Sequence, residues 1–287
     1  MQKQEALLLA ERAAEIRLRS VDAIYHAKSG HPGGSLSISD LLAYLYFKEL
    51  RIDPANPQDP ARDRFVLSKG HCCPALYAAL AIRGFFPVED LNTLRKLGSY
   101  LSGHPDMKNV PGVDMSTGSL GQGISAAAGM ALVGKREAHE CAPYRVYTVL
   151  GDGELQEGQV WEAAMFAGHY GLDNLIAFVD FNHLQIDGDV REVMNPTPID
   201  RKFEAFGWYA QCVDGHSFEQ LETAIENAKQ ADKPAVIVMT TVKGKGVSFM
   251  ENQSGWHGKA PKAEEYEVAM KELTATYEQC KEATIHG

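Results

Sequence analysis

The sequence of 287 residues has no long apolar run and no excess of basic charge. No stretch approaches the roughly 18 apolar residues that cross a membrane, and the first twenty residues, MQKQEALLLAERAAEIRLRS, mix charges throughout and lack the apolar core of a signal peptide. The net charge is -10, from 28 basic and 38 acidic residues. This balance argues against a nucleic-acid or anionic-membrane surface. A local anion site stays open, because backbone amides, helix dipoles and metals bind anions without net basic charge.

Cysteine is scarce as well. The five cysteines lie at positions 72, 73, 141, 212 and 280, an odd number without metal-type spacing. This usage predicts reduced thiols in a cytoplasmic protein. Cys72 and Cys73 are expected to pack in a helix.

The apolar patterning predicts alternating strands and helices. Strand-like runs are centred on residues 64–67, 145–151, 174–180, 209–213 and 235–241. Helical periods cover 4–28, a segment from Ser37 or Ser39 to about Leu50, a segment ending at Ala81, and 120–133, 156–170, 218–230 and 262–282. Such alternation predicts an α/β fold, with a mostly parallel sheet and helices on both faces. Because there is no repeat or linker, we expect residues 1–287 to form a single domain.

Two polar residues follow two of these strands. Asp152 lies in the turn Gly151-Asp152-Gly153 after one strand, and Asn182 follows the next. Ligands of parallel α/β sheets bind beyond the carboxyl ends of the strands, so one crossover unit places both side chains on the same rim. Carboxylate and amide oxygens suit Mg²⁺ or Ca²⁺, and the two glycines let the backbone approach a diphosphate.

Each feature also has an ordinary explanation. A Gly-Asp-Gly sequence is a common turn, and Asn is common after a strand. The glycine spacing at 151–158 does not match a dinucleotide fingerprint, and no phosphate-binding Walker sequence is present. The interpretation of Asp152 and Asn182 as ligands of a metal and a diphosphate is favoured because both belong to one strand–helix–strand unit.

This pairing resembles the thiamine diphosphate motif, and the chain resembles the N-terminal, diphosphate-binding part of transketolases along nearly its whole length. The matching segments are SGHPGGSLS (29–37), DRFVLSKGH (63–71), LSGHP (101–105), TGSLGQGIS (117–125), DKPAVIVMTT (232–241) and WHG (256–258). The resemblance implies a thiamine diphosphate-binding fold and a transferase that moves a two-carbon ketol unit from a ketose, typically a phosphate, to an aldose.

The resemblance also assigns ligands. Mg²⁺, with Ca²⁺ or Mn²⁺ as alternatives, would be held by Asp152, Asn182 and the carbonyl of Leu184. The positions expected to contact thiamine diphosphate are His71, Gly118, Ser119, Leu120, Gly151, Asp152, Gly153, Glu154, Asn182 and His257. Ser119 stands where transketolases usually have Pro, and Lys69 stands where many have Asn, which leaves the sugar substrate open.

Four of the ten histidines, His31, His71, His104 and His257, lie in loops flanked by Gly or Pro. The resemblance places His71 and His257 near the diphosphate and reacting centre, and assigns substrate hydroxyls and proton movement to His31 and His104. It assigns Glu157 to a proton network at a subunit interface. The other histidines are interpreted as ordinary polar residues; they are His26, His139, His169, His183, His216 and His286.

Thiamine catalysis also needs a glutamate beside the aminopyrimidine, which in this family belongs to a pyrimidine-binding domain. The sequence ends at Gly287, and we expect that domain to belong to a separate chain. We therefore expect this chain to be the N-terminal subunit of a two-chain transketolase. Such an enzyme would act in carbohydrate metabolism, for example in the pentose phosphate reactions. It would be active only with a C-terminal partner subunit, in an α2β2 heterotetramer. Alternatives are a subunit of a 1-deoxyxylulose-5-phosphate synthase-like or 2-oxo acid dehydrogenase-like enzyme, which residues 242–246 resemble equally, or a non-catalytic interaction subunit.

Overall fold

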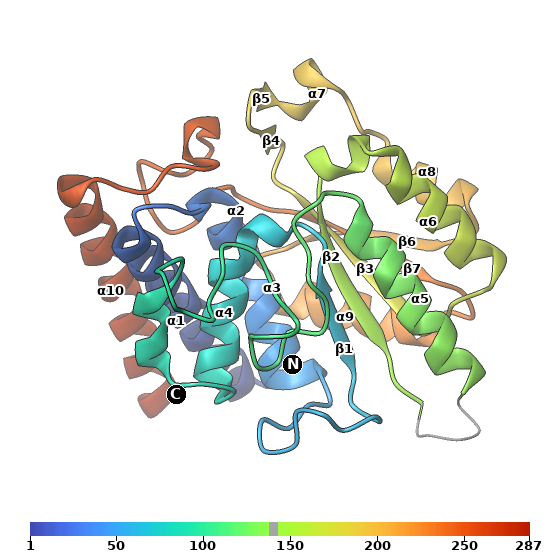
Figure 1. Ribbon diagram of the computed structural model, residues 1–287, viewed down its shortest axis with the longest axis horizontal. Coiled ribbons are helices and arrows are strands. Elements are labelled where there is room, and N and C mark those ends of the chain that lie inside the picture. The colour runs from blue at the N-terminus through green and yellow to red at the C-terminus, as the bar shows by residue number, and fades with distance from the viewer. Residues whose placement is uncertain (138–142) are drawn as a thin grey trace.

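The computed structural model describes residues 1–137 and 143–287, so His139 and Cys141 lie outside the described residues. A five-stranded sheet runs through the molecule (Figure 1). Its order is β1 (Arg64–Leu67), β2 (Val146–Gly151), β3 (Leu175–Phe181), β7 (Ala235–Thr240) and β6 (Tyr209–Asp214). All four pairings are parallel. The predicted α/β fold with a parallel sheet is confirmed.

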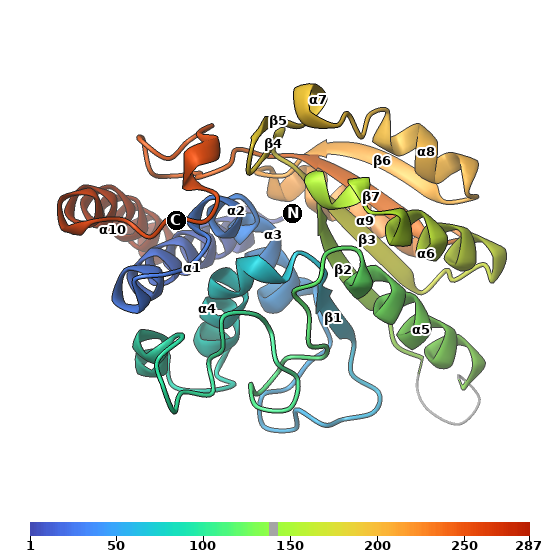
Figure 2. The same cartoon turned by 45° about the horizontal axis from the view of Figure 1, so that its top comes forward.

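Alternate residues of the strands bury themselves against helices on opposite faces. In β3, Ile176 and Phe178 join one core cluster, whereas Ala177 and Val179 join the other. The first cluster includes α1 (Lys3–Ala27), α3 (Ser39–Tyr44), α4 (Cys73–Arg83) and α9 (Phe218–Gln230). The second includes α5 (Gln122–Arg136), α6 (Gly158–His169) and α8 (Ile199–Ala205), on one side of the sheet in Figure 2. Burial on both faces explains why these strands read as continuous apolar runs.

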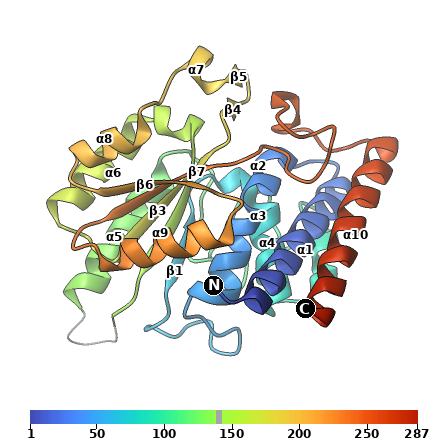
Figure 3. The ribbon, with the colours of Figure 1, turned by 180° about the vertical axis from the view of Figure 1, so that it is seen from behind.

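A third, smaller cluster attaches the last helix. Helix α10 (Ala263–His286) lies along α1 in Figure 3. Ala269 and Leu273 of α10 pack with Leu18 and Val21 of α1. None of the helices in the described parts of the chain is long and apolar enough to cross a membrane. The four described cysteines are free thiols.

The helix expected from Ser37 or Ser39 to about Leu50 is present from Ser39, as α3 and the turn that follows it, and an unpredicted short helix precedes it. Helix α2 (Pro32–Ser37) starts directly after His31 and is followed by α3 and a π-helical turn, η1 (Leu45–Glu49). Proline is favourable at the first position of a helix. Gly33 and Gly34 lie within this helix, where other segments approach too closely for a side chain: a Cβ atom on Gly34 would lie 2.7 Å from Cys72 Sγ.

Several short elements were not predicted. The chain after β3 forms a hairpin of β4 (Leu184–Gln185) and β5 (Gly188–Asp189), then α7 (Val190–Val193), which project above the sheet in Figure 1. Short 3₁₀ turns lie at Gly70–Cys72 (η2), Val88–Thr93 (η3), Gly153–Gln156 (η4) and Ser254–Trp256 (η5). The hairpin and the turns η2, η4 and η5 lie around the carboxyl ends of the strands, where the polar loops converge.

Candidate active site

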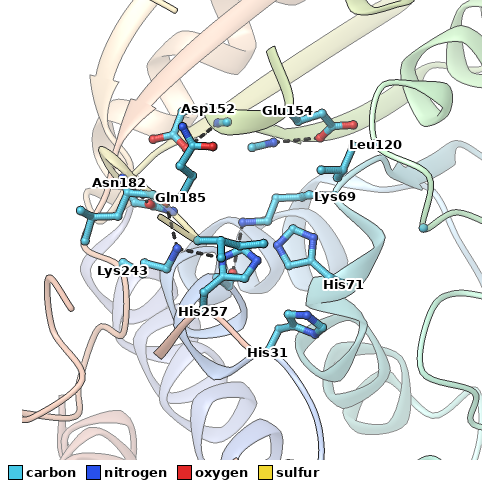
Figure 4. Close-up of a pocket in the computed structure, with 16 residues that line it drawn as sticks. His31, Lys69, His71, Leu120, Asp152, Glu154, Asn182, Gln185, Lys243 and His257 are labelled. Carbon is cyan, nitrogen blue, oxygen red and sulfur yellow. Dashed lines mark hydrogen bonds between the residues drawn. The ribbon is translucent and has the colours of Figure 1, made fainter. Parts of the chain in front are cut away.

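A cleft of about 250 Å³ opens beyond the carboxyl ends of β1, β2, β3 and β7 (Figure 4). Its wall contains nine of the ten positions expected to contact the cofactor. They are His71, Gly118, Leu120, Gly151, Asp152, Gly153, Glu154, Asn182 and His257. Leu184, expected as a metal ligand, and His31 line the same cleft. The tenth position, Ser119, is exposed and is not part of the cleft wall.

Asp152 is a buried carboxylate at the end of β2. Its Oδ1 atom accepts a hydrogen bond from the Gly153 amide at 2.8 Å, and its Oδ2 atom accepts one from the His183 amide at 2.7 Å. Burial and the nearby Asp180 raise the pKa of Asp152 to about 7. A carboxylate in these surroundings is a strong acceptor for a cation.

Asn182 and Leu184 follow β3, the neighbour of β2 in the sheet, and line the same cleft as Asp152. The Leu184 amide donates to Asn182 Oδ1 at 3.1 Å. Between them His183 adopts a left-handed conformation with φ of 67°, which non-glycine residues adopt rarely. The backbone of His183 therefore forms this turn. The sequence analysis, which interpreted His183 as an ordinary polar residue, did not predict this role.

Lys243 enters the cleft just after β7 and was not predicted as a site residue. Its Nζ atom donates to the Leu184 carbonyl at 2.9 Å and lies 3.0 Å from His257 Nδ1 (Figure 4). Burial and the charge of Lys69 lower the pKa of Lys243 to about 8. Its position directly after a strand of the same sheet was a signal available in the sequence.

The donors around this point fit a hard divalent cation. The Leu184 carbonyl accepts the hydrogen bond from the Lys243 ammonium group, so its oxygen faces a positively charged group at the cleft wall. The described residues contain no group of three or more His, Cys, Asp and Glu side chains able to hold a metal. A metal here would depend on carboxylate, amide and carbonyl oxygens completed by phosphate oxygens, the usual arrangement for Mg²⁺.

The four loop histidines lie close together, and three of them, His31, His71 and His257, line the cleft. The ring of His31 lies 5.1 Å from that of His71, 5.5 Å from that of His257 and 6.4 Å from that of His104, between centroids. Burial, reinforced by neighbouring cations, lowers the pKa of His31 to about 4 and that of His257 to about 3. The pKa values of His71 and His104 are lowered too, primarily by burial. All four rings are therefore neutral near pH 7 and able to donate or accept protons.

Arg95 joins two of the histidine loops and carried no signal in the sequence. Its guanidinium donates to Ser29 Oγ, two residues before His31, and to the Gly103 carbonyl beside His104, both at 2.9 Å. The backbone of Arg95 is left-handed, with φ of 59°.

Glu154 lines the cleft, but its oxygens contact protein groups. The carboxylate accepts hydrogen bonds from the Gly121 amide at 2.9 Å, the Gly151 amide at 3.0 Å and the Ser68 hydroxyl. Burial raises its pKa. Glu154 thus ties the turn before α5 to the turn after β2. Glu157 lies apart, exposed at the N-terminus of α6.

Comparisons with known proteins agree with this geometry. The model of the family described as "Transketolase, thiamine diphosphate binding domain" matches residues 9–282. The chain belongs to the transketolase family. A relative from Clostridium sp. (strain MSTE9), the 6-deoxy-6-sulfo-D-fructose transketolase subunit SqwG, is 49% identical over 94% of this chain and 98% of its own length. An apulose-4-phosphate transketolase subunit of Phocaeicola vulgatus is 43% identical over 92% of each chain.

The crystal structure of transketolase from Campylobacter jejuni superposes with a TM-score of 0.88 at 33% identity. It covers 98% of this chain, and this chain covers 46% of that protein. These relatives confirm the predicted transketolase-type transferase over the synthase and dehydrogenase alternatives, and the thiamine diphosphate-binding fold over other α/β folds.

Proposed function

We propose that residues 1–287 form one thiamine diphosphate-binding domain, the N-terminal subunit of a two-chain transketolase. The observation that carries the proposal is that Asp152, Asn182 and Leu184 line one cleft together with three neutral histidines, His31, His71 and His257. The fourth, His104, lies next to His31. The two relatives described above are named as transketolase subunits and match over nearly their full lengths.

Asp152, Asn182 and the Leu184 carbonyl would hold Mg²⁺, with Ca²⁺ or Mn²⁺ as alternatives, and through it the diphosphate. When bound, thiamine diphosphate supplies the nucleophilic carbon that takes up a two-carbon unit from a ketose and passes it to an aldose. Lys243 would leave the Leu184 carbonyl to the metal and pair with the diphosphate. Gly151 and Gly153 add no side chain there, which leaves the backbone open to the phosphates.

The histidines would handle the sugar and its protons. His257 contacts Lys243, and the ring of His71 lies 5.0 Å from that of His257 between centroids. His31 and His104 extend the group away from it, where sugar hydroxyls would bind. Neutral imidazoles suit this work, because each ring carries one donor and one acceptor. Glu157, exposed beside the turn at Gly121, is proposed to act at a subunit interface rather than in the cleft.

A partner chain would complete the site. Leu120 and Ile186 line the cleft yet are 37% and 66% exposed, so the mouth presents apolar side chains that a partner would cover. We propose that a C-terminal subunit with the pyrimidine-binding domain supplies the activating glutamate, in a cytoplasmic α2β2 heterotetramer. The donor is a ketose, and the relatives' sulfonated and phosphorylated sugars stand beside pentose phosphates as the compounds to test.

The test is an assay of the chain with such a partner, thiamine diphosphate and Mg²⁺. Ketose donors would include a pentulose phosphate, 6-deoxy-6-sulfo-D-fructose and apulose 4-phosphate, each with an aldose acceptor. Transfer of two carbons supports the proposal. Decarboxylation of pyruvate, or its condensation with an aldehyde, without ketol transfer would contradict it.

A further inference from the structure

Asp180 occupies the centre of a buried polar cluster directly behind the expected metal ligands. The residue is fully buried near the end of β3. Its Oδ2 atom accepts hydrogen bonds from Ser37 Oγ at 2.7 Å and Asn182 Nδ2 at 3.0 Å, and pairs with Lys69. Its Oδ1 atom accepts one from Thr241. These donors come from α2 and from the segments after β1, β3 and β7, so one carboxylate joins four parts of the cleft wall.

The hydrogen bond from Asn182 fixes how its amide points. An asparagine amide has one oxygen and one NH₂ group, and the two ends are nearly equal in shape. With NH₂ donating to Asp180, the oxygen is left on the side of the Leu184 amide, which donates to it at 3.1 Å. The flipped amide would set its oxygen against the Asp180 carboxylate and present NH₂ to the cation.

We propose that Asp180 is a positioning residue for the metal: it orients the Asn182 amide so that the oxygen faces the cation. The inference rests on the proposed function, because Asn182 is a metal ligand only if the cleft holds the metal and diphosphate. Groups that orient metal ligands in this way typically change metal affinity by about 10–100-fold when they are removed.

Stability alone does not account for the Lys69–Asp180 pair. Lys69 is 1% exposed and Asp180 is 0% exposed, so both charges are withdrawn from water. A buried ion pair generally adds little stability over apolar residues of similar size. Its place in the cleft wall, in contact with an expected metal ligand, gives it a task that an apolar pair could not perform.

The simplest variant, Asp180→Asn, removes the carboxylate but leaves Lys69 unpaired and adds positive charge near the metal. The variant Lys69→Met with Asp180→Leu avoids both effects, because it removes the pair together and keeps the local net charge. Asn182 then loses its orienting acceptor. The matched control is Arg62→Met with Asp114→Leu, which removes another largely buried ion pair that lies outside the cleft.

The measurement is a thermal-shift titration of the purified full chain with Mn²⁺ or Mg²⁺ at fixed, excess thiamine diphosphate. We expect the half-saturating metal concentration to rise about 10–100-fold in Lys69→Met/Asp180→Leu and in Asp180→Asn. The control pair should change the melting temperature without moving the half-saturating concentration. A folded Lys69→Met/Asp180→Leu chain with wild-type metal affinity would overturn the role of Asp180. If the wild-type chain showed no metal-dependent cofactor binding either alone or together with its C-terminal partner, the proposed function would be overturned, and this inference with it.

Discussion

The substitution Asp152→Asn tests whether the chain maintains a destabilising charge in order to bind a cation. Burial and Asp180 raise the pKa of Asp152 from 3.8 to about 7. Because the folded-state pKa is the higher one, ionisation destabilises the folded chain increasingly as the pH rises from about 4 to 7. At pH 8 the shift of about three units corresponds to about 4 kcal/mol.

Asparagine removes this charge but brings a loss of its own. Its single oxygen serves only one of the two amides, Gly153 and His183, that the carboxylate now accepts from. The amide left without a partner costs about 1–3 kcal/mol. We therefore expect Asp152→Asn to stabilise the metal-free chain by about 1–3 kcal/mol at pH 8. Near pH 4 only the cost of the unpaired amide remains, so the variant should there be less stable than the wild type by about 1–3 kcal/mol.

The assay is urea denaturation in EDTA between pH 4 and 8, followed by melting with thiamine diphosphate and Mg²⁺. The exposed Asp232→Asn is the control and should match the wild type in both. The reasoning is refuted if Asp152→Asn is less stable than the wild type at pH 8 in EDTA. It is also refuted if the variant keeps the metal-dependent rise in melting temperature.

Three further predictions concern the same cleft. Burial is the main cause that lowers the pKa of His31 from 6.5 to about 4 and that of His257 from 6.5 to about 3. The stability of the folded chain that depends on these neutral rings is therefore complete above pH 6.5 and is lost as the pH falls toward 4. Between pH 6.5 and 4, the melting temperature of His31→Asn/His257→Asn should fall less steeply than that of the wild type. Lys69→Met should lower the free energy of unfolding by about 3–5 kcal/mol, because Asp180 keeps a buried charge without its cation. Urea denaturation measures this free energy. A decrease below about 1 kcal/mol would argue against an ionised Lys69–Asp180 pair. Glu154→Ala leaves two turn amides without an acceptor and should lower the free energy of unfolding by about 1–3 kcal/mol for each. It should also weaken thiamine diphosphate binding measured by calorimetry. Unchanged affinity for thiamine diphosphate would show that the carboxylate does not hold the turns in place.

Much of this arrangement could be predicted from the sequence. The strands were recognisable because both of their faces are buried, which makes them continuous apolar runs. Asp152 and Asn182 could be brought together because one crossover helix separates neighbouring strands, β2 and β3. The proximity of the four histidines could be predicted because each lies in a loop flanked by Gly or Pro and because the family resemblance assigns all four to the active site.

The remainder depended on tertiary pairing. The sheet inserts β7 between β3 and β6, and only this order brings Lys243 to the Leu184 carbonyl and Thr241 to Asp180. The sequence also could not show that Asp180, inside a strand, receives four donors from separate segments. Helix α2 was not predicted because glycines usually indicate a loop, whereas here close contact with Cys72 requires Gly34.

The most direct test of the account is to titrate the purified chain with its C-terminal partner chain and to follow ketol transfer with thiamine diphosphate and Mg²⁺ present. The account predicts no turnover by either chain on its own, activity that saturates at equal amounts of the two chains, and no activity when Asp152→Asn replaces the wild-type chain. Full turnover by this chain without any partner, or undiminished turnover by the Asp152→Asn complex, would contradict it.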